Sequence, residues 1–338
     1  MADNKGKKPG SIGLSALTAL WPAAFVFVLL PIVVPVRDWT MDMLLATSIG
    51  VSLLVFLLTF YVKETLEFSV FPTVLLFTTL FRLSLNVAST RLILVHGHEG
   101  SDAAGRLIET FGHLMVSGDF VVGLVIFILL VIINFFVITK GSGRIAEVAA
   151  RFTLDALPGK QMAIDADLSS GLINEDQARK RREDVALQSE FYGAMDGASK
   201  FIRGDAIAGI LITGINIIGG LIVGVARHDL SLGEATSVYT ILTVGDGLVS
   251  QIPALVISVS AGIIVTRVGG DVRLDRQIGK QFLSNPKVLV SLALLMALMM
   301  LIPGFRTPFM VMAVVVGFMA WRAARQLKSK RTDSIEPA

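Results

Sequence analysis

The sequence contains no cysteine and few charged residues. Without a thiol it can form no disulfide, no zinc–thiolate site and no cysteine nucleophile. Charged residues make up 17% of its 338 positions, below the roughly 25% of an ordinary soluble domain. The formal net charge is only +3, which gives little support to nucleic acid as a partner. The composition therefore argues against a disulfide scaffold and against a nucleic-acid-binding protein.

Long apolar runs account for most of the chain, 53% of which is hydrophobic. Several runs approach or exceed the ~20 apolar residues that a helix needs to cross a bilayer. The sequence therefore predicts an all-α polytopic membrane protein with about eight transmembrane helices, the first of them uncleaved. The eight predicted spans are 17–36, 42–62, 68–90, 113–138, 206–226, 239–265, 287–303 and 308–323.

One polar segment, residues 139–205, separates the first four spans from the last four. It carries ten Lys and Arg residues and contains no apolar run long enough to cross a membrane. We expect a small helical cytoplasmic subdomain here. The chain then divides into a cytoplasmic tail (1–16), spans one to four (17–138), this subdomain (139–205), spans five to eight (206–323) and a linker (324–338).

The basic residues set the orientation of the spans. With the N-terminus in the cytoplasm, 24 Lys and Arg residues fall on the cytoplasmic side and four on the outer side. Because positively charged loops stay inside, the sequence predicts that both termini are cytoplasmic.

Local signals predict helices within the polar segment. Residues 144–152 align Ile145, Val148, Ala149 and Phe152 along one helical stripe. Asn174 and Gln177 have the spacing of a capping box. Pro158 and Gly159 indicate a turn between two helices.

Glycine and proline mark two of the later spans. Gly220 and Gly224 are four residues apart, which lets another helix approach closely. Pro253 should kink the sixth span and free a backbone carbonyl.

Charged groups inside apolar spans are the strongest functional candidates, because each costs several kcal/mol unless it is paired or hydrated. The third span carries Arg82, Asn86 and Arg91. Arg82 and Asn86 share a helical face, whereas Arg91 points about half a turn away. Arg82 is expected to have a buried partner, and Arg91 either has one or reaches the outer headgroups.

Asp205 opens the fifth predicted span and Asp246 lies inside the sixth. Asp205 either serves as a helix N-terminal carboxylate or has a functional partner. The two aspartates enter from opposite surfaces and should lie on the order of 20 Å apart, too far for an aspartyl-protease dyad. Carboxylates at separate depths better suit a proton or cation route.

Other chemical motifs are incomplete. LDALPGKQ lacks the first glycine and the Ser/Thr of a phosphate-binding loop, and DADLSSGLINED has its glycine one place late for a calcium loop. His96 and His98 could bind a metal, but a plain solvated loop is the favoured interpretation. We expect a protein that is not an enzyme and holds no metal or other cofactor.

Three stretches closely resemble the FHIPEP family of type III secretion export-gate proteins. They are LEFSVFPTVLLFTTLFRLSLNVASTRLIL (66–94), VITKGSGRIAEVAARFTLDALPGKQMAIDADL (137–168) and FYGAMDGASKFIRGDAIAGI (191–210). The resemblance extends from about residue 20 to 270. Residues 86–89, 111–113 and 197–200 are more similar to the flagellar member than to the injectisome member.

The resemblance implies a ring, usually of nine subunits, at the flagellar basal body in the bacterial inner membrane. Such proteins couple the proton motive force to export of unfolded flagellar subunits. Implied partners are other export-gate membrane proteins, together with substrates, chaperones and the ATPase complex. These last three dock mainly on a cytoplasmic domain that this sequence lacks. The coupling ion could be H⁺ or Na⁺.

The family's important charges correspond here to Arg82, Arg91, Lys200, Asp205 and Asp246. We expect Asp205 to form a cytoplasmic-side switch with Lys200 and Arg203, while Asp246 and Arg82 bias proton access from the outer side. The polar segment corresponds to the family's hallmark loop, and its candidates for contacts between subunits are Arg144, Glu147, Arg151, Asp155, Lys160, Asp165 and Asp167. Three alternatives stay open, namely an injectisome homologue of the same gate, a structural ring scaffold without ion coupling, and an autonomous ion or solute transporter.

Overall fold

A computed structural model describes residues 11–116, 120–267, 286–299 and 306–333. Residues 1–10 of the predicted tail, most of the loop after the sixth span, and the end of the predicted linker lie outside the described residues. Every regular element within the described ranges is helical, which confirms the predicted all-α class.

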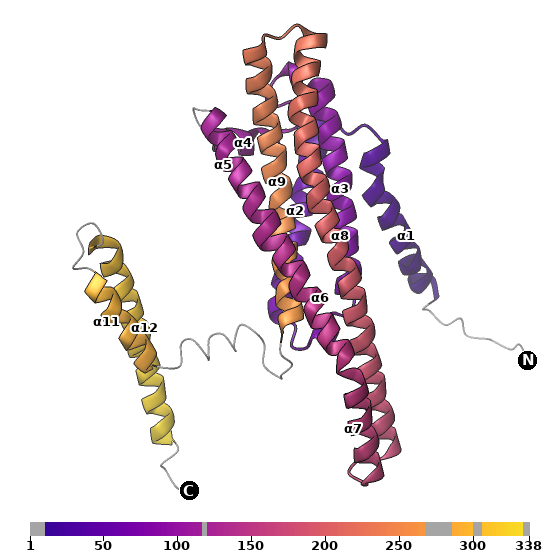
Figure 1. Ribbon diagram of the computed structural model, residues 1–338, viewed down its shortest axis with the longest axis vertical. Helices are drawn as coiled ribbons and strands as arrows, with labels where there is room; N and C mark the ends of the chain where they lie inside the picture. Colours follow the sequence, from indigo (N-terminus) through magenta and orange to yellow (C-terminus); the bar gives the residue numbers. More distant parts are fainter. Residues whose placement is uncertain (1–10, 117–119, 268–285, 300–305, 334–338) are drawn as a thin grey trace, which may run out of the picture. The chain divides into compact units, whose positions relative to one another are not determined.

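Figure 1 shows the order of the helices along the chain by colour. Five of the described helical segments are long and apolar enough to cross a membrane; eight spans remain a prediction. The α-helices are α1 (Ser11–Val33), α2 (Asp38–Tyr61), α3 (Phe71–His96), α4 (Arg106–Val116), α5 (Phe120–Ile133), α6 (Lys140–Asp155), α7 (Leu157–Ser169), α8 (Glu175–His228), α9 (Leu232–Thr266), α11 (Pro286–Met299) and α12 (Arg306–Asp333).

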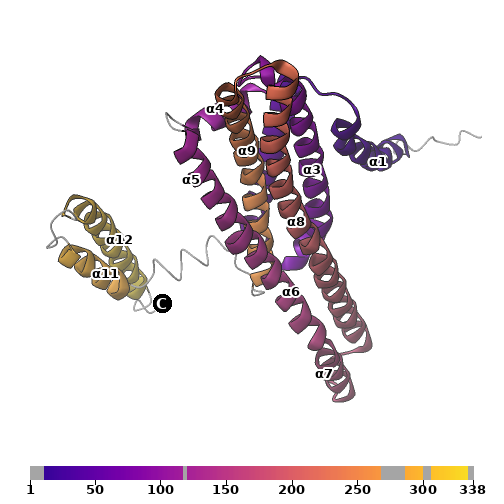
Figure 2. The same cartoon turned by 45° about the horizontal axis from the view of Figure 1, so that its top comes forward.

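These helices form two units. In the second unit, α11 packs against α12 through Leu289, Val316 and Ala320. In the first, α3, α8 and α9 run side by side, as both ribbon views show (Figures 1 and 2). One core of this unit joins Met41 of α2, Leu85 of α3, and Tyr239 of α9. The central helices therefore pack through inward-facing apolar side chains, and their other faces are left for lipid.

Helix α8 is the longest element, 54 residues without interruption. At 1.5 Å per residue it measures about 80 Å, more than twice the ~30 Å hydrocarbon thickness. Asp205 stands inside this helix rather than at its start. The interpretation of Asp205 as a helix N-terminal carboxylate is therefore wrong, because the polar-to-apolar change at this point is a change of surroundings and not a helix end.

The start of α8 carries the predicted capping box. The Asn174 side chain accepts a hydrogen bond from the Gln177 backbone N–H (2.8 Å), and the Asn174 N–H donates to the Gln177 side chain (3.0 Å). These bonds satisfy two of the donors that every helix N-terminus leaves free. The prediction from the Asn174–Gln177 spacing is confirmed.

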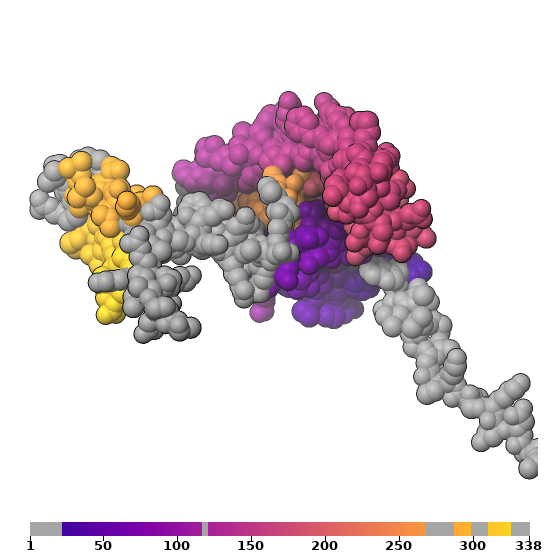
Figure 3. All heavy atoms as spheres, turned by 90° about the horizontal axis from the view of Figure 1, so that it is seen from below, coloured from indigo at the N-terminus to yellow at the C-terminus, as the bar shows by residue number. Residues whose placement is uncertain are grey.

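Helices α7 and α8 form a hairpin (Figure 1), and the residues at its turn are coloured rose in Figure 3. Its turn uses Gly171, whose φ of +75° favours glycine. The turn predicted at Pro158 and Gly159 is wrong, because Pro158 occupies the first turn of α7. A proline there removes an N–H that would have no helical partner anyway.

Helix α6 does form, but its apolar stripe faces outward. Phe152 is 69% exposed, and Ile145 and Val148 are also exposed. The buried residues of α6 are the small ones, Gly143, Ala146 and Ala150. Small side chains let the α6 backbone approach α8 and α9 closely, so the larger apolar side chains remain on the surface of the subunit.

Helix α4 was not expected from the sequence. The predicted span 113–138 begins inside α4, whereas the apolar helix begins at Phe120 in α5 and passes through a π-helix, η3 (Asn134–Thr139), into α6. The carboxylate of Asp42 on α2 accepts the backbone N–H groups of Arg106 and Leu107, each at 3.0 Å. This carboxylate from another helix caps α4 and fixes its position.

The predicted close approach at Gly220 and Gly224 is made by Tyr239 of α9. A Cβ added to Gly220 would lie 2.3 Å from the Tyr239 ring, and one added to Gly224 would lie 2.7 Å from it. The ring is fully buried. The Tyr239 ring of α9 therefore packs directly against the α8 backbone at these two glycines.

Replacing Gly220 by alanine should destabilise the bundle by about 1–3 kcal/mol, because the added methyl group overlaps a ring that has no space to move. Gly214→Ala is the matched control, since nothing lies within 4 Å of its added Cβ and alanine favours the helix. Thermal unfolding in detergent should show a lower Tm for Gly220→Ala only. Equal Tm values for the two variants would contradict this packing.

Candidate functional site

A buried ion pair joins α3 to α8. The Arg82 guanidinium contacts the Asp205 carboxylate, and the two side chains are only 6% and 4% exposed. Arg82 lies within the buried face of α3, which repeats every three to four residues through Leu75, Thr79, Arg82 and Asn86. The partner that the sequence predicted for Arg82 is thus a carboxylate of the predicted fifth span.

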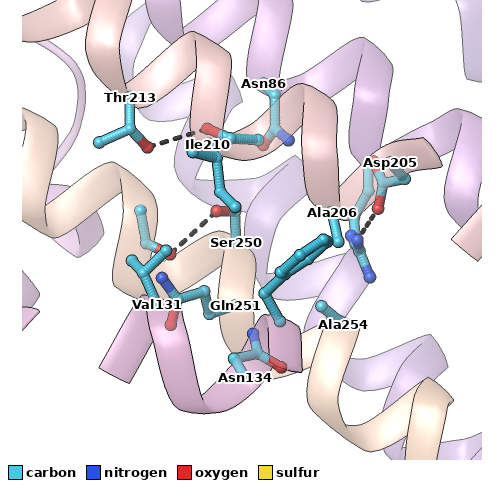
Figure 4. Close-up of a pocket in the computed structure, with 14 residues that line it drawn as sticks. Asn86, Val131, Asn134, Asp205, Ala206, Ile210, Thr213, Ser250, Gln251 and Ala254 are labelled. Carbon is cyan, nitrogen blue, oxygen red and sulfur yellow. Dashed lines mark hydrogen bonds and ion pairs between the residues drawn. The ribbon is translucent and has the colours of Figure 1, made fainter. Parts of the chain in front are cut away.

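A cavity of about 50 Å³ adjoins this ion pair. Its polar lining includes Asn86, Thr213 and Gln251, which Figure 4 shows converging on one space from α3, α8 and α9. Thr213 donates to the Gly209 carbonyl (2.9 Å) and Ser250 to the Gly247 carbonyl (3.0 Å). Both hydroxyl oxygens therefore keep their lone pairs free to accept hydrogen bonds.

Asp246 forms a second buried polar cluster where α3, α8 and α9 meet. The Asn216 side-chain amide donates to its carboxylate at 3.3 Å. The Ser89 hydroxyl lies beside the carboxylate and donates to the Asn86 carbonyl (3.1 Å). Asp246 is 5% exposed and Asn216 fully buried. No salt-bridge partner for Asp246 occurs among the described residues, so only neutral groups hold this carboxylate.

The two aspartates lie well apart along the bundle. Asp205 and Asn216 are eleven residues apart on one helix, which corresponds to about 16 Å. Arg82 lies beside Asp205 and Ser89 lies beside Asp246. These two residues are seven positions apart on α3, which corresponds to about 10 Å along the helix axis. The separation is too large for a shared proton, in agreement with the exclusion of a protease dyad.

Lys200 and Arg203 do not accompany Asp205 in this site. The Lys200 ammonium pairs with Asp196 (2.9 Å) and is largely exposed, while the Arg203 guanidinium lies against Gly143 of α6. Residues two and five positions apart on a helix point in different directions. The expected grouping of Lys200 and Arg203 around Asp205 therefore does not form, and Arg82 is the ion-pair partner of Asp205.

Arg91 is exposed and lies away from this cluster. It lines a separate cleft with Pro31 and Val34 near α1. Arg82 is buried and Arg91 is not, as the nine-residue spacing on α3 suggested.

Several candidates in the polar segment are held within the chain itself. Arg181 pairs with Asp167 at 2.8 Å, and Arg182 pairs with Asp165. Asp165 and Asp167 belong to the incomplete calcium-loop motif, and both carboxylates are bound by arginine side chains. Lys160 donates to Gln188 (2.9 Å), which further ties α7 to α8. The remaining candidates lie on α6: Glu147 and Arg151 pair with each other at 3.5 Å, and Arg144 and Asp155 are exposed.

The sequence interpretation assigned no role to several polar residues of this site. They are Asn134, Thr213, Asn216, Ser250 and Gln251. Their signal is the spacing of polar residues on three apolar helices: 82, 86 and 89 on α3, 205, 213 and 216 on α8, and 243, 246 and 250 on α9. Each set follows one helical face.

Comparison with known proteins identifies similar sequences. The sequence profile of the FHIPEP family matches residues 28–338. The flagellar biosynthesis protein FlhA of Proteus mirabilis is 57% identical over 283 residues, which cover 84% of this chain and 41% of that protein. FlhA of Escherichia coli K12 is 54% identical over 310 residues, 91% of this chain and 45% of the relative.

A third relative shows a similar degree of identity. FlhA of Caulobacter vibrioides is 52% identical over 314 residues, 93% of this chain and 45% of that protein. The chain thus spans somewhat less than half the length of these curated relatives. No solved structure matches it.

Arg82→Gln or Asp205→Asn alone should each cost about 3–5 kcal/mol of stability, because either change leaves a buried group without its partner. The double variant should recover most of this loss, since it leaves no unpaired charge. Unfolding of all three proteins in detergent would measure the coupling between the two side chains.

The matched control is Arg179→Gln with Glu183→Gln, an exposed pair on α8 at 3.1 Å. Removing it should change stability by less than about 1 kcal/mol. If the Arg82/Asp205 double variant loses as much as the two single variants together, the ion pair does not stabilise the bundle.

Proposed function

The chain belongs to the FHIPEP family, and we propose that it is the membrane region of a flagellar export component in the bacterial inner membrane. In this proposal it couples the proton motive force to export of unfolded flagellar subunits. The single observation that carries the coupling role is the buried Arg82–Asp205 ion pair beside a polar cavity. In this position, a proton can reach the ion pair and change its charge, and the change in charge can alter the packing of α3 against α8.

Protonation of Asp205 is the switching step of the proposal. A neutral carboxyl no longer compensates Arg82, whose charge is costly at this depth. The contact between α3 and α8 then weakens at the point where α8 passes into the polar hairpin. Because α8 is continuous, a shift at Asp205 is carried into the α7–α8 hairpin. The two states of the switch are then the one with the Arg82–Asp205 pair formed and the one with the pair released. The coupling ion is H⁺ or Na⁺, and no other cofactor is involved.

We further propose that subunits assemble in a ring, of nine by family resemblance. The exposed apolar side chains of the polar helices support assembly. Phe152 on α6, Met162 on α7 and Leu172 in the turn before α8 are 69%, 66% and 76% exposed, and the charged segment that carries them is unsuited to a lipid environment. Neighbouring subunits or other export-gate membrane proteins would cover these side chains. Substrates, chaperones and the ATPase complex would interact mainly with parts of the complete protein beyond this sequence.

A purely structural scaffold is the second candidate, and the same ion pair favours it. A buried pair can hold two helices together without ever changing its charge. The two functions differ in whether a titratable group is required at Asp205 once the helices are held together.

Export by the double variant Arg82→Gln/Asp205→Asn separates coupling from scaffolding. The variant has no unpaired buried charge, so it should reach normal membrane levels and cross-link into assemblies as the wild type does. It has no proton acceptor at Asp205, so export of flagellar subunits into the medium should fall to the background of a strain lacking the gene. The complete protein should be used in motile cells.

The exposed double variant Arg179→Gln/Glu183→Gln is the control and should export normally. Wild-type export by the Arg82/Asp205 double variant would rule out the coupling role and favour the scaffold. Assembly without export is the outcome that the coupling role requires.

A further inference from the structure

Two adjoining clefts lie where the chain leaves α1 and where α3 ends. The inner cleft, about 170 Å³, has a mostly apolar lining that includes Arg91. The outer cleft, about 510 Å³, is lined by charged side chains from the start of α2 and from the segment after α3. Residues that line both clefts are Pro35, Val36, Leu92 and His96. The two therefore form one continuous space, which we call the α1–α3 cleft.

The walls of this cleft follow from the packing of α1 along α3 (Figure 1). The rings of Phe25 and Phe77 meet edge to face at 5.9 Å and hold the two helices together. Further along α3, Ala88, Leu92 and His96 are each four residues apart and lie on one face. This face forms one wall of the cleft.

Arg91 has no anionic partner in the described part of the chain. It lies in the apolar length of α3, five residues before the helix ends, and no salt bridge among the described residues includes it. The neighbouring side chains of Pro31, Val34 and Val95 offer no hydrogen-bond acceptor. A charge within an apolar span is costly unless it is paired or hydrated. An anion that enters the cleft from the membrane satisfies this requirement.

A tryptophan places the outer cleft at the level of lipid headgroups. Trp39 follows Asp38 at the start of α2 and is 62% exposed. Exposed tryptophan rings favour the boundary between hydrocarbon and water. The outer cleft, which includes Asp38, therefore faces the headgroup region, and the inner cleft with Arg91 faces the upper part of the acyl chains.

The charges of the cleft are arranged in a definite order. Arg91 lies about 7.5 Å along the axis before the end of α3, and its long side chain can extend toward the interface. Beyond the helix end, the outer cleft presents three carboxylates and one guanidinium, from Asp38, Glu99, Asp102 and Arg37. From the acyl chains outward, the cleft is thus first positive and then predominantly negative.

A zwitterionic phospholipid has the complementary order, because its phosphate lies nearer the acyl chains than its amine does. We infer that the α1–α3 cleft binds phosphatidylethanolamine, with the lipid phosphate on Arg91 and the lipid ammonium at Glu99 and Asp102. A primary ammonium has three N–H donors for these carboxylates, whereas the trimethylammonium of phosphatidylcholine has none. The uncharged glycerol headgroup of phosphatidylglycerol leaves the carboxylates without a cation. The site is therefore selective for one headgroup.

The test measures lipid binding to the complete protein in detergent. A phosphatidylethanolamine with a photoreactive acyl chain is the probe, and cross-linked peptides are identified by mass spectrometry. Cross-links should fall on peptides that contain residues 31–36 and 88–96. Unlabelled phosphatidylethanolamine should compete about tenfold better than phosphatidylcholine or phosphatidylglycerol, the effect of one hydrogen bond between charged groups. Inorganic phosphate should not compete, because it lacks both the amine and the acyl chains.

Two variants separate the phosphate contact from the ammonium contact. Arg91→Gln should weaken binding of the probe about tenfold, and Arg91→Lys should retain part of it, because a lysine keeps the charge without the planar fork. Glu99→Gln with Asp102→Asn should abolish the preference over phosphatidylglycerol. The control, Arg106→Gln, removes an exposed arginine of α4 that does not line the cleft, and should bind the probe as the wild type does.

The change in selectivity distinguishes a lipid site from a structural role, since a residue that only supports the fold would not alter the ratio between headgroups. Equal competition by the three lipids, wild-type binding by Arg91→Gln, or unchanged selectivity in the Glu99/Asp102 variant overturns the inference. Cross-links from these peptides to a neighbouring subunit in place of the lipid also overturn it. None of these measurements requires export or ion flux, so the lipid site stands or fails independently of the coupling function.

Discussion

The buried contact between Arg82 and Asp205 is the constraint on which the arrangement of this bundle depends. Neither charge can be left alone at a depth where water is scarce, because an isolated charge there costs several kcal/mol. The pair therefore determines which face of α3 meets α8, and at what height. Once that contact is fixed, Asn86 and Ser89 must face the same interior, since they follow Arg82 on one face of α3.

Close backbone contacts then hold α9 in place around the same interior. A Cβ on Gly245 would lie 2.0 Å from the Ile108 carbonyl oxygen of α4, and one on Gly247 would lie 2.5 Å from the Phe127 ring. Glycines on the outward sides of α9 let α4 and α5 approach closely, which turns the opposite face toward α3 and α8. That face carries Asp246 and Ser250. Steric contacts on one side of α9 thus place polar groups on the other.

Local features of this fold could be predicted from the sequence, but contacts between distant segments could not. The apolar runs predicted α2, α3 and α9, and the Asn174–Gln177 spacing predicted the start of α8, because these signals act within a few residues. The partner of Arg82 depends on which helices pack together, and hydropathy carries no information about that. The sequence interpretation ended a domain at Asp205 because composition changes there. Composition does not mark a helix end, and α8 continues through Gly204 and Asp205. Helix α4 was missed because its cap, Asp42, comes from α2.

A polar cavity beside the ion pair is what makes a stable contact compatible with a change of charge. In a dry interior, a neutralised Asp205 would leave Arg82 with no solvation, and the desolvation cost would oppose protonation. Water next to the guanidinium lowers that cost, because several hydrogen-bond acceptors are then within reach. A filled cavity would instead lock the pair. The small space bounded by Asn86, Thr213 and Gln251 therefore determines whether this buried ion pair can also be released.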